Sequence, residues 1–299
     1  MGRTHLAILT EKRYLNPEKN SSYIDNILTE DFLVQVELEK LGLSCSRVAW
    51  DDNFTPSKFR FALFRTTWNY FEKLPFFLKF LHSCTNKTQL INPNKQILWN
   101  LDKKYLLDLY FAGINIPPTL IVKRGEQKSL SAVCKKNKWP EVVIKPCISA
   151  AAWNTHHLKK VHSDSANKLF FDLNQRCDMM VQCFQKNIKK LGEMSLMMIG
   201  GHYSHAVLKR AKAGDFRVQD DFGGTVSSYK PTPKEVGFAQ QVLGALFFQP
   251  IYARIDIIFD NENNLALSEL ELIEPEMWFR LNPDSPKKLA QHIVSHMKS

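Results

Sequence analysis

The sequence lacks any apolar run long enough to cross a membrane. A spanning helix needs about 20 consecutive apolar residues, whereas Ile251–Ile258 is already interrupted by Arg254 and Asp256. The opening residues, Met1-Gly2-Arg3-Thr4-His5, lead into a short apolar run and not into the long apolar segment of a secretory signal. We therefore expect a cytoplasmic protein with no membrane partner.

Clustered metal-binding side chains of the zinc type are also missing. The six cysteines of the 299 residues stand far apart, with no CxxC pair and no cysteine–histidine ligand spacing. We expect free, largely buried thiols, because a disulfide framework is unusual in a cytosolic chain of this size. His156-His157 is the one adjacent histidine pair, and no second ligand group lies near it in the sequence. A transition-metal site there is not expected.

The common nucleotide-binding and hydrolase signatures are absent. The chain has no GxxxxGK[ST], no GxGxxG and no GxSxG. Its net charge of +10 is spread along the sequence without a nucleic-acid-binding motif. We do not expect nucleic acid as a partner, and attraction of small anionic substrates such as nucleotides explains the sign of the charge. The sequence leaves a homo-oligomer open.

Apolar periodicity predicts a mixed α/β protein. The N-terminal part alternates strands and helices, which is typical of an α/β unit. Further on, strand patterns dominate, and two runs about Gly200-Gly201 predict a β-hairpin. The expected strands are 5–9, 44–50, 59–64, 119–122, 141–144, 179–184, 195–199, 203–208, 251–259 and 265–272, and the expected helices are 24–41, 75–83, 101–111, 235–247 and 286–297.

The last predicted hairpin carries acidic residues inside otherwise apolar strands. Asp256 lies in the first strand, and Glu269 and Glu271 lie two residues apart in the second, so both glutamates face the same side of the sheet. Carboxylates gathered on one face repel one another unless cations lie among them. We saw no regular alternation of lysine or arginine opposite them, which argues against an ordinary solvated strand face. Mg²⁺ prefers such oxygen ligands, together with nucleotide phosphates.

Several other segments follow one another in a fixed order, and they carry a resemblance to a known family. They are Arg65-Thr66-Thr67-Trp68-Asn69-Tyr70, Trp99-Asn100-Leu101-Asp102-Lys103, Val142-Val143-Ile144-Lys145-Pro146, Val181-Gln182-Cys183-Phe184, Gly192-Glu193, and Gly214-Asp215-Phe216-Arg217-Val218-Gln219 followed by Gly223-Gly224. Together with the acidic hairpin, they resemble the ATP-grasp superfamily, and within it the glutathione-synthetase-like group that includes the cycloserine-forming ligases.

The resemblance implies an ATP-grasp fold in three parts. Residues 1–96 would form an N-terminal α/β pre-ATP-grasp domain, 97–178 a central lobe, and 179–299 a C-terminal lobe with the magnesium-binding hairpin. The two lobes would clasp ATP between antiparallel sheets. In this family, ATP and Mg²⁺ activate a carboxylate as an acyl phosphate, which an amine then displaces.

The resemblance also implies roles for individual residues. Lys103 and Lys145 would contact phosphates, Gln182 and Phe184 the adenine, and Glu193 the ribose, with Ser149 in the phosphate-covering loop. Asp256, Glu269 and Glu271 would hold magnesium. Arg217 is our candidate for stabilising the oxyanion, Lys209 would lie close to the phosphates, and Arg65 would bind a substrate carboxylate.

Two departures from the family pattern bear on turnover. The stretch 147–155 reads CISAAAWNT where the family usually has a glycine-rich loop, and backbone with φ > 0 costs more without glycine. The third magnesium position is Glu271 where glutathione synthetases carry asparagine.

The sequence leaves three functions open. The first is a ligase that joins a small amino-acid-like or peptide carboxylate to an amine. The second is a ligase that closes a ring, as in cycloserine formation. The third is a nucleotide-binding regulatory or scaffold protein without turnover. The altered loop favours the third, and the acidic hairpin favours the first two.

Overall fold

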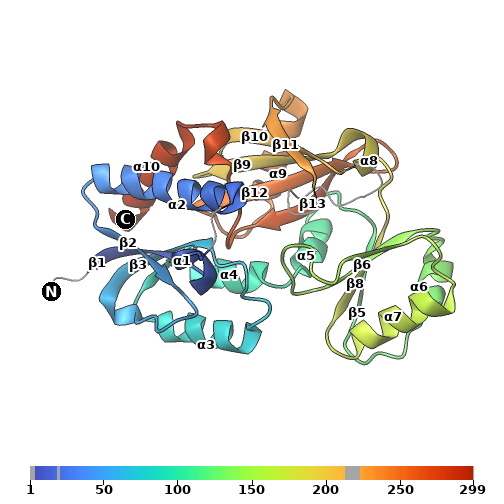
Figure 1. The fold of residues 1–299 in the computed structure, drawn as a ribbon. Coiled ribbons are helices and arrows are strands. Elements are labelled where there is room, and N and C mark those ends of the chain that lie inside the picture. The colour runs from blue at the N-terminus through green and yellow to red at the C-terminus, as the bar shows by residue number, and fades with distance from the viewer. Residues whose placement is uncertain (1–3, 19–20, 213–222, 299) are drawn as a thin grey trace.

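The chain folds into three units, each built on one β-sheet (Figure 1). The computed structural model describes residues 4–18, 21–212 and 223–298. The first sheet is parallel, whereas the strands of the other two pair antiparallel. This confirms the expected α/β unit followed by two antiparallel sheets. No helix within the described ranges is long and apolar enough to cross a membrane.

The N-terminal unit is a four-stranded sheet of order β2-β1-β3-β4. The side chains of Leu6, Ala7, Ile8 and Leu9 are completely buried, as expected of a parallel strand that is covered on both faces. Helix α2 begins at Ser22 because the Ser21 hydroxyl accepts a hydrogen bond from the Ile24 amide. The elements are β1 (Thr4–Thr10), α1 (Lys12–Leu15), α2 (Ser22–Lys40), β2 (Cys45–Ala49), η1 (Pro56–Lys58), β3 (Phe59–Thr66), α3 (Leu74–Cys84), β4 (Gln89–Ile91) and α4 (Asn94–Asn100).

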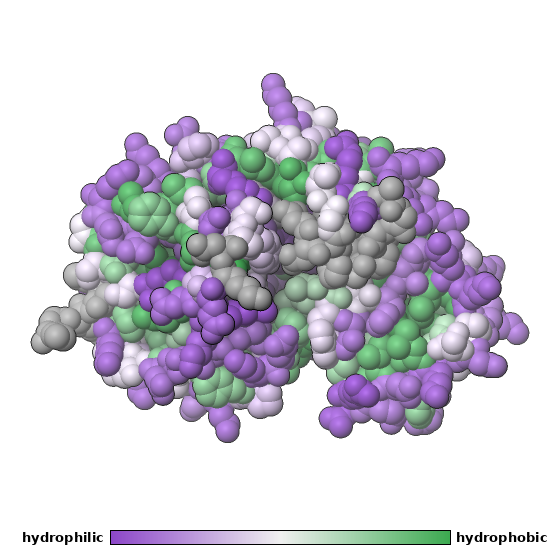
Figure 2. Space-filling view, viewed as in Figure 1, coloured by the Kyte–Doolittle hydropathy of each residue, from purple (hydrophilic) through white to green (hydrophobic). Residues whose placement is uncertain are grey.

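The middle unit is a four-stranded sheet of order β5-β8-β6-β7, at lower right in Figure 1. It has a core of its own, in which α6 and α7 cover one face of the sheet with apolar side chains such as Val133 and Phe170. The surface is hollowed between this unit and the N-terminal unit (Figure 2). The elements are α5 (Tyr105–Phe111), β5 (Thr119–Val122), α6 (Leu130–Asn137), β6 (Val142–Pro146), β7 (His156–Leu158), α7 (Asp164–Asn174) and β8 (Met179–Cys183). The short helix α8 (Ile188–Leu191) follows and packs against the C-terminal sheet.

The C-terminal unit is a five-stranded sheet of order β11-β10-β9-β12-β13. Strand β12 lies between β9 and β13, and almost all of its side chains are buried. Helix α9 begins with a capping box, in which Thr232 and Glu235 satisfy each other's backbone amides. The elements are β9 (Glu193–Ile199), β10 (His202–Arg210), β11 (Thr225–Tyr229), α9 (Pro233–Gly244), β12 (Tyr252–Phe259), β13 (Leu265–Glu271), η3 (Phe279–Leu281) and α10 (Ser285–Lys298).

Three boundaries that we expected from sequence need correction. Strand β8 belongs to the middle sheet, so that unit extends past residue 178 to Cys183. The expected boundary after residue 96 falls inside α4. The helix expected over 101–111 begins only at Tyr105, because the Lys103 amide donates to the Cys147 carbonyl at 2.8 Å and so ties the preceding turn to the middle unit.

The N-terminal and C-terminal units share a core. Helix α10 packs beside α2, and residues of β1, β9 and β12 contribute to one apolar cluster. Asn92, just after β4, donates to the Tyr252 and Leu272 carbonyls at 2.9 and 2.7 Å. The buried Tyr252 hydroxyl donates to the Ile273 carbonyl at 2.7 Å. These contacts fix the N-terminal unit against the strands that carry the acidic hairpin.

Candidate active site

A single cavity of about 860 Å³ is lined by residues of all three units. One wall of the cavity is formed by the face of β12 and β13. The other wall is formed by the middle sheet and its 147–155 loop. Every expected site residue that the structure describes lines it, except Arg65: these are Lys103, Lys145, Ser149, Gln182, Phe184, Glu193, Lys209, Asp256, Glu269 and Glu271. Residues separated by up to 168 positions (271 − 103) therefore meet in one place.

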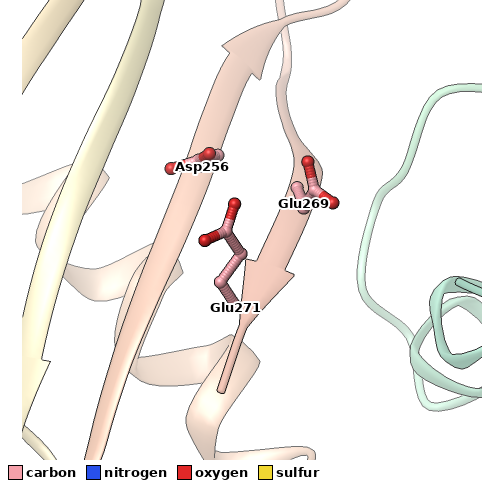
Figure 3. A group of neighbouring side chains, drawn as sticks. All are labelled: Asp256, Glu269 and Glu271. Carbon is pink, nitrogen blue, oxygen red and sulfur yellow. The ribbon is translucent and has the colours of Figure 1, made fainter. Parts of the chain in front are cut away.

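The three carboxylates of the hairpin converge as the two-residue strand period predicted. Asp256 on β12 pairs in register with Glu269 on β13, and the Glu271 side chain points toward Asp256 (Figure 3). One ligand oxygen from each of the three residues lies within 4.8 Å of the others. Burial raises the pKa of the Glu271 carboxyl to about 7, and the negative charges of Glu269 and Asp256 act in the same direction.

Cations of the chain itself lie among these carboxylates, contrary to what we concluded from the sequence. Arg254 pairs in register with Glu271 and donates to it, and it binds both oxygens of Asp256 at 3.0 and 2.9 Å. Although burial opposes it, the positive charge of Arg254 holds the pKa of Asp256 well below its usual range. Sequence reasoning missed Arg254, and its position two residues before Asp256 on one strand was the available signal.

Lys209 links two acids at the edge of this group. Its ammonium lies 2.5 Å from Glu193 and 3.0 Å from Asp256, and all three side chains are buried. Ser195 donates to Asp256 at 2.6 Å. Burial lowers the pKa of Lys209, but the charges of Asp256 and Glu193 outweigh burial and raise it. Lys209 is therefore a fixed positive charge beside the metal-type carboxylates.

Two further lysines face the cavity with different partners. Lys103 pairs with Glu269 at 2.8 Å and donates to the Ser149 carbonyl at 2.6 Å. Lys145, at the end of β6, forms no ion pair or side-chain hydrogen bond with the described residues, and burial lowers its pKa. Lys145 is half-buried, and an ammonium withdrawn from water without a carboxylate partner is costly unless an anion joins it. Lys145 is thus the clearest feature of the cavity that calls for an anionic ligand.

The loop after β6 adopts the backbone that a glycine-rich loop would adopt, although it contains no glycine. Ala151, Ala152 and Asn154 have positive φ angles of 48°, 53° and 49°. The loop lines the cavity, and Trp153 contacts Phe71 of the N-terminal unit with ring centroids 5.5 Å apart. The Ser149 hydroxyl donates to the Pro146 carbonyl at 3.2 Å. Alanine at such φ values is strained. The absence of glycine from this loop therefore costs backbone energy.

The part of the cavity around Phe184 is aromatic and apolar. Phe184 lies against the His157 ring with a centroid separation of 3.8 Å, and His157 pairs with Glu141 at 2.9 Å. Gln182 lines the same region and donates to the Thr119 hydroxyl at 2.8 Å. Val143 and Ile258 add apolar surface. An aromatic wall with polar groups at its rim suits the ring of a base.

Of the two expected arginines, only Arg65 is described by the structure, and it does not line the cavity. Arg65 is 2% exposed and pairs with Glu30 of α2, so it does not line the cavity as a substrate-binding residue would. The pairing with Asp51 or Asp52, which a purely local role would predict, is not formed; Asp51 pairs with Lys73 instead. Arg217 and its segment 214–219 lie outside the described residues.

One aromatic residue that sequence reasoning left out, Trp278, covers the cations. The Trp278 ring lies 5.1 Å from the Arg254 guanidinium and 5.7 Å from the Lys209 ammonium. Trp278 itself has a φ of 46°, which is unusual for a bulky residue. Tyr70 and Trp68 line the same end of the cavity, where the Trp68 indole donates to the Glu274 carbonyl at 2.9 Å. These contacts are made over distances along the chain that no local pattern signals.

The donor set fits magnesium. Asp256, Glu269 and Glu271 offer only carboxylate oxygens, which are hard ligands of the kind that Mg²⁺ prefers. The second oxygen of each glutamate accepts no hydrogen bond from the described residues, since Lys103 and Arg254 bind the first. No sulfur or imidazole lies among the three residues, which disfavours zinc.

Two family models match the chain in order. Residues 6–92 match the family described as D-cycloserine synthetase DcsG, N-terminal domain. Residues 104–276 match the family described as prokaryotic glutathione synthetase, ATP-grasp domain, and this match covers more than half of the chain. The two matches together span the N-terminal sheet and both sheets that enclose the cavity.

Comparisons with individual proteins agree with these matches. The chain is 25% identical over 274 residues to the cycloserine biosynthesis protein DcsG of Streptomyces lavendulae, covering 86% of this chain and 90% of that protein. A crystal structure of D-cycloserine synthetase DcsG superposes with a TM-score of 0.84 at 23% identity, covering 98% and 99% of the two chains. D-alanine–D-alanine ligase from Bacillus anthracis gives 0.66 at 14% identity, covering 98% and 96%.

Proposed function

The chain belongs to the ATP-grasp ligase family of the prokaryotic glutathione synthetase type, and from this premise we propose that it activates a small carboxylate with ATP and Mg²⁺ as an acyl phosphate. An amine then displaces the phosphate. The observation that carries the proposal is the half-buried Lys145, which has no partner among the described residues and lies in the same cavity as the Asp256, Glu269 and Glu271 carboxylates.

ATP would lie along the cavity from the aromatic end to the acidic end. Phe184 would contact the base, with Gln182 at its edge. Lys145 and Lys103 would bind phosphate oxygens, and the phosphate charge would take the place that Glu269 now fills beside Lys103. Glu193 would receive the ribose, and the backbone around Ser149 would cover the phosphates. The positive cavity lysines attract the nucleotide, and the net charge of +10 acts in the same direction.

Asp256, Glu269 and Glu271 would hold magnesium, which when bound neutralises charge on the phosphates. The cations of the chain prepare Asp256 and Glu269 for this role. Arg254 and Lys209 hold Asp256 ionised, and Lys103 and Lys145 lower the pKa of Glu269 against the effect of burial. Carboxylates that are already ionised at neutral pH need not lose a proton before they bind a cation.

The chemistry would proceed in two steps. A carboxylate oxygen of the substrate attacks the γ-phosphorus, and the bond to the bridging oxygen breaks to release ADP. The amine then attacks the acyl carbon, loses a proton, and expels phosphate. Negative charge develops on the carbonyl oxygen in the second step and requires a nearby cation. Arg254 and Lys209 provide fixed positive charge at this end, and Arg217 remains our candidate for direct contact with the oxyanion.

A second candidate is ring closure within one substrate. The match of residues 6–92 to the N-terminal domain of D-cycloserine synthetase favours it, because this unit closes the substrate end of the cavity with Tyr14, Trp68 and Tyr70. In that case the nucleophile and the acyl phosphate belong to the same molecule. The two reactions consume ATP in the same way and differ in whether the product contains one substrate molecule or two.

The test is an ADP-release assay with Mg-ATP across amino acids, their O-substituted derivatives and short peptides. We expect ADP release that depends on one carboxylate substrate. A product with the mass of one substrate molecule less water supports ring closure, and a product that joins two molecules supports intermolecular ligation. Glu269→Gln should abolish release, whereas Glu262→Gln in the exposed β12–β13 turn serves as the matched control. Nucleotide binding without release by any compound would favour a regulatory or scaffold role and contradict the proposal.

A further inference from the structure

A second, smaller cavity of about 310 Å³ lies outside the active site, between the β9–β10 turn and helix α10. Its polar lining consists of His202, Tyr203, Ser204, Lys288, Gln291 and His292. It shares none of its lining residues with the active-site cavity. Nothing in the proposed ligase chemistry uses these side chains.

The shape of this cavity is fixed by close packing of the turn against the helix. A Cβ atom added to Gly200 would lie 2.2 Å from the His292 ring, so the imidazole occupies the space that only glycine leaves open. The Ser204 hydroxyl lies 2.7 Å from the Ser285 hydroxyl at the start of α10. The imidazole and the hydroxyls therefore occupy defined positions in the fold.

The lining is rich in hydrogen-bond donors and contains no carboxylate. Among the described residues, Lys288 forms no ion pair, and the imidazoles of His202 and His292 form no hydrogen bond. Lys288 and His292 lie four residues apart on one face of α10, so both side chains point to the same side. The pKa of His292 is lowered by burial first and then by His296 and His202. Positive and donor groups thus gather here without a compensating acid.

We propose that this cavity binds a small organic phosphate, with the phosphoryl group between Lys288, His292 and His202. Lysine and imidazole N–H groups are donors suited to phosphate oxygens. Ile199 and the Tyr203 ring supply an apolar wall for the organic part. The volume lies near the lower end of the range of about 300–1,000 Å³ that small-ligand pockets occupy, which suits a phosphomonoester of a few carbons.

A transition metal is the other ligand class that imidazoles bind. Lys288 argues against it, because its ammonium adds positive charge to the same cavity and would repel a cation. The nitrogens of His202, His292 and His296 also do not cluster as metal ligands do. Among the described residues, only Asp256, Glu269 and Glu271 bring three ligand atoms within 4.8 Å of one another. An anion is therefore the ligand that the charges favour.

The test is calorimetric titration of the full chain with glycerol 3-phosphate and, separately, with inorganic phosphate. A saturating non-hydrolysable ATP analogue with Mg²⁺ fills the active site in every titration. We expect saturable binding, with the organic phosphate binding more tightly than inorganic phosphate because of the apolar wall. Lys288→Met and His292→Gln should each weaken binding by about tenfold or more, the effect of losing a charged hydrogen bond.

Lys287→Met is the matched control, since this exposed lysine on the same helix does not line the cavity. Lys288→Arg keeps the charge and should retain binding, which separates loss of the ligand from loss of the fold. Equal affinity in all variants, or no saturable heat with either phosphate, would overturn the proposal. A saturable response to Zn²⁺ without one to phosphate would also overturn it.

Discussion

The Arg65 guanidinium and the Glu30 carboxylate lie 2.5 Å apart, although both side chains are almost completely buried. Glu30 also accepts hydrogen bonds from the Met277 and Phe279 amides at 2.7 and 3.2 Å. The pair thus joins β3 and α2 to the segment that follows β13. That segment carries Trp278, whose ring covers Arg254 and Lys209 at the acidic end of the cavity. Arg65 contributes to the site through this segment.

Arg65→Met should destabilise the fold by about 3–5 kcal/mol, because it leaves Glu30 buried without its partner. Urea denaturation measures the change in the free energy of unfolding. The double variant Arg65→Met/Glu30→Gln should lose less than the sum of the single variants. Arg60→Met is the control, since this exposed arginine lies on the same strand and should change stability by less than about 0.5 kcal/mol. If Arg65→Met left stability unchanged and weakened only substrate use, a substrate-binding role for Arg65 would be restored.

Lys145→Met should weaken binding of Mg-ADP by about 10- to 100-fold, because one charged hydrogen bond to phosphate is worth roughly 1.5–3 kcal/mol. Its stability without nucleotide should not fall, since the half-buried ammonium has no partner to lose among the described residues. Nucleotide titration followed by thermal shift measures both quantities. Lys136→Met on the exposed face of α6 is the control. Unchanged nucleotide affinity in Lys145→Met would contradict the proposed phosphate contact.

Ala152→Gly should preserve or raise the rate of ADP release. Alanine at a φ of 53° carries strain of about 1–2 kcal/mol that glycine does not, and the entropy of the unfolded glycine chain offsets part of the gain. Ala152→Val should lower both stability and turnover, because a β-branched residue tolerates this backbone poorly. Steady-state kinetics and thermal melts of the three proteins give the comparison. A valine variant with normal turnover would show that the loop reaches another conformation in the working enzyme.

The stability of the fold should fall as the pH drops from 6.5 toward 4, in part because of His205. Burial lowers the pKa of His205 to about 4, while the hydrogen bond from its Nε2 to the Met277 carbonyl acts in the opposite direction. Because the pKa is lower in the folded state, the neutral imidazole stabilises the fold above the unfolded pKa. That contribution, about 2–3 kcal/mol, is lost as the pH falls through the folded pKa.

His205→Gln tests this assignment, because glutamine can still donate to the Met277 carbonyl but does not titrate. Denaturant unfolding at several pH values should show a flatter dependence in the variant between pH 6.5 and 4. The carboxylates of the active site titrate in both proteins, so the difference between the two curves isolates His205. Parallel curves for the two proteins would refute the assignment.

Local sequence patterns predicted much of this protein. Runs of apolar residues placed most strands and the long helices, since each strand or helix buries its own face with its own period. The two-residue period of a strand placed Glu269 and Glu271 together and Asp256 opposite them. The same period places Arg254, two residues before Asp256, on the same face of β12. The resemblance supplied Lys103, Lys145 and Lys209, which all line the cavity.

Other features depended on contacts between segments far apart in the chain. In the sequence, Arg65 is an arginine near the end of a predicted strand. Its pairing with Glu30, and not with a ligand, depends on how α2 packs against β3. The end of the middle unit depends on which sheet β8 joins. Trp278 meets Lys209, 69 residues before it, and the second cavity brings together His202 and His292, which lie 90 residues apart. Local patterns record the burial and direction of each side chain. Which residue each side chain contacts is determined by the tertiary structure, because the contact depends on how the three units are placed relative to one another. No single segment of the sequence encodes that placement.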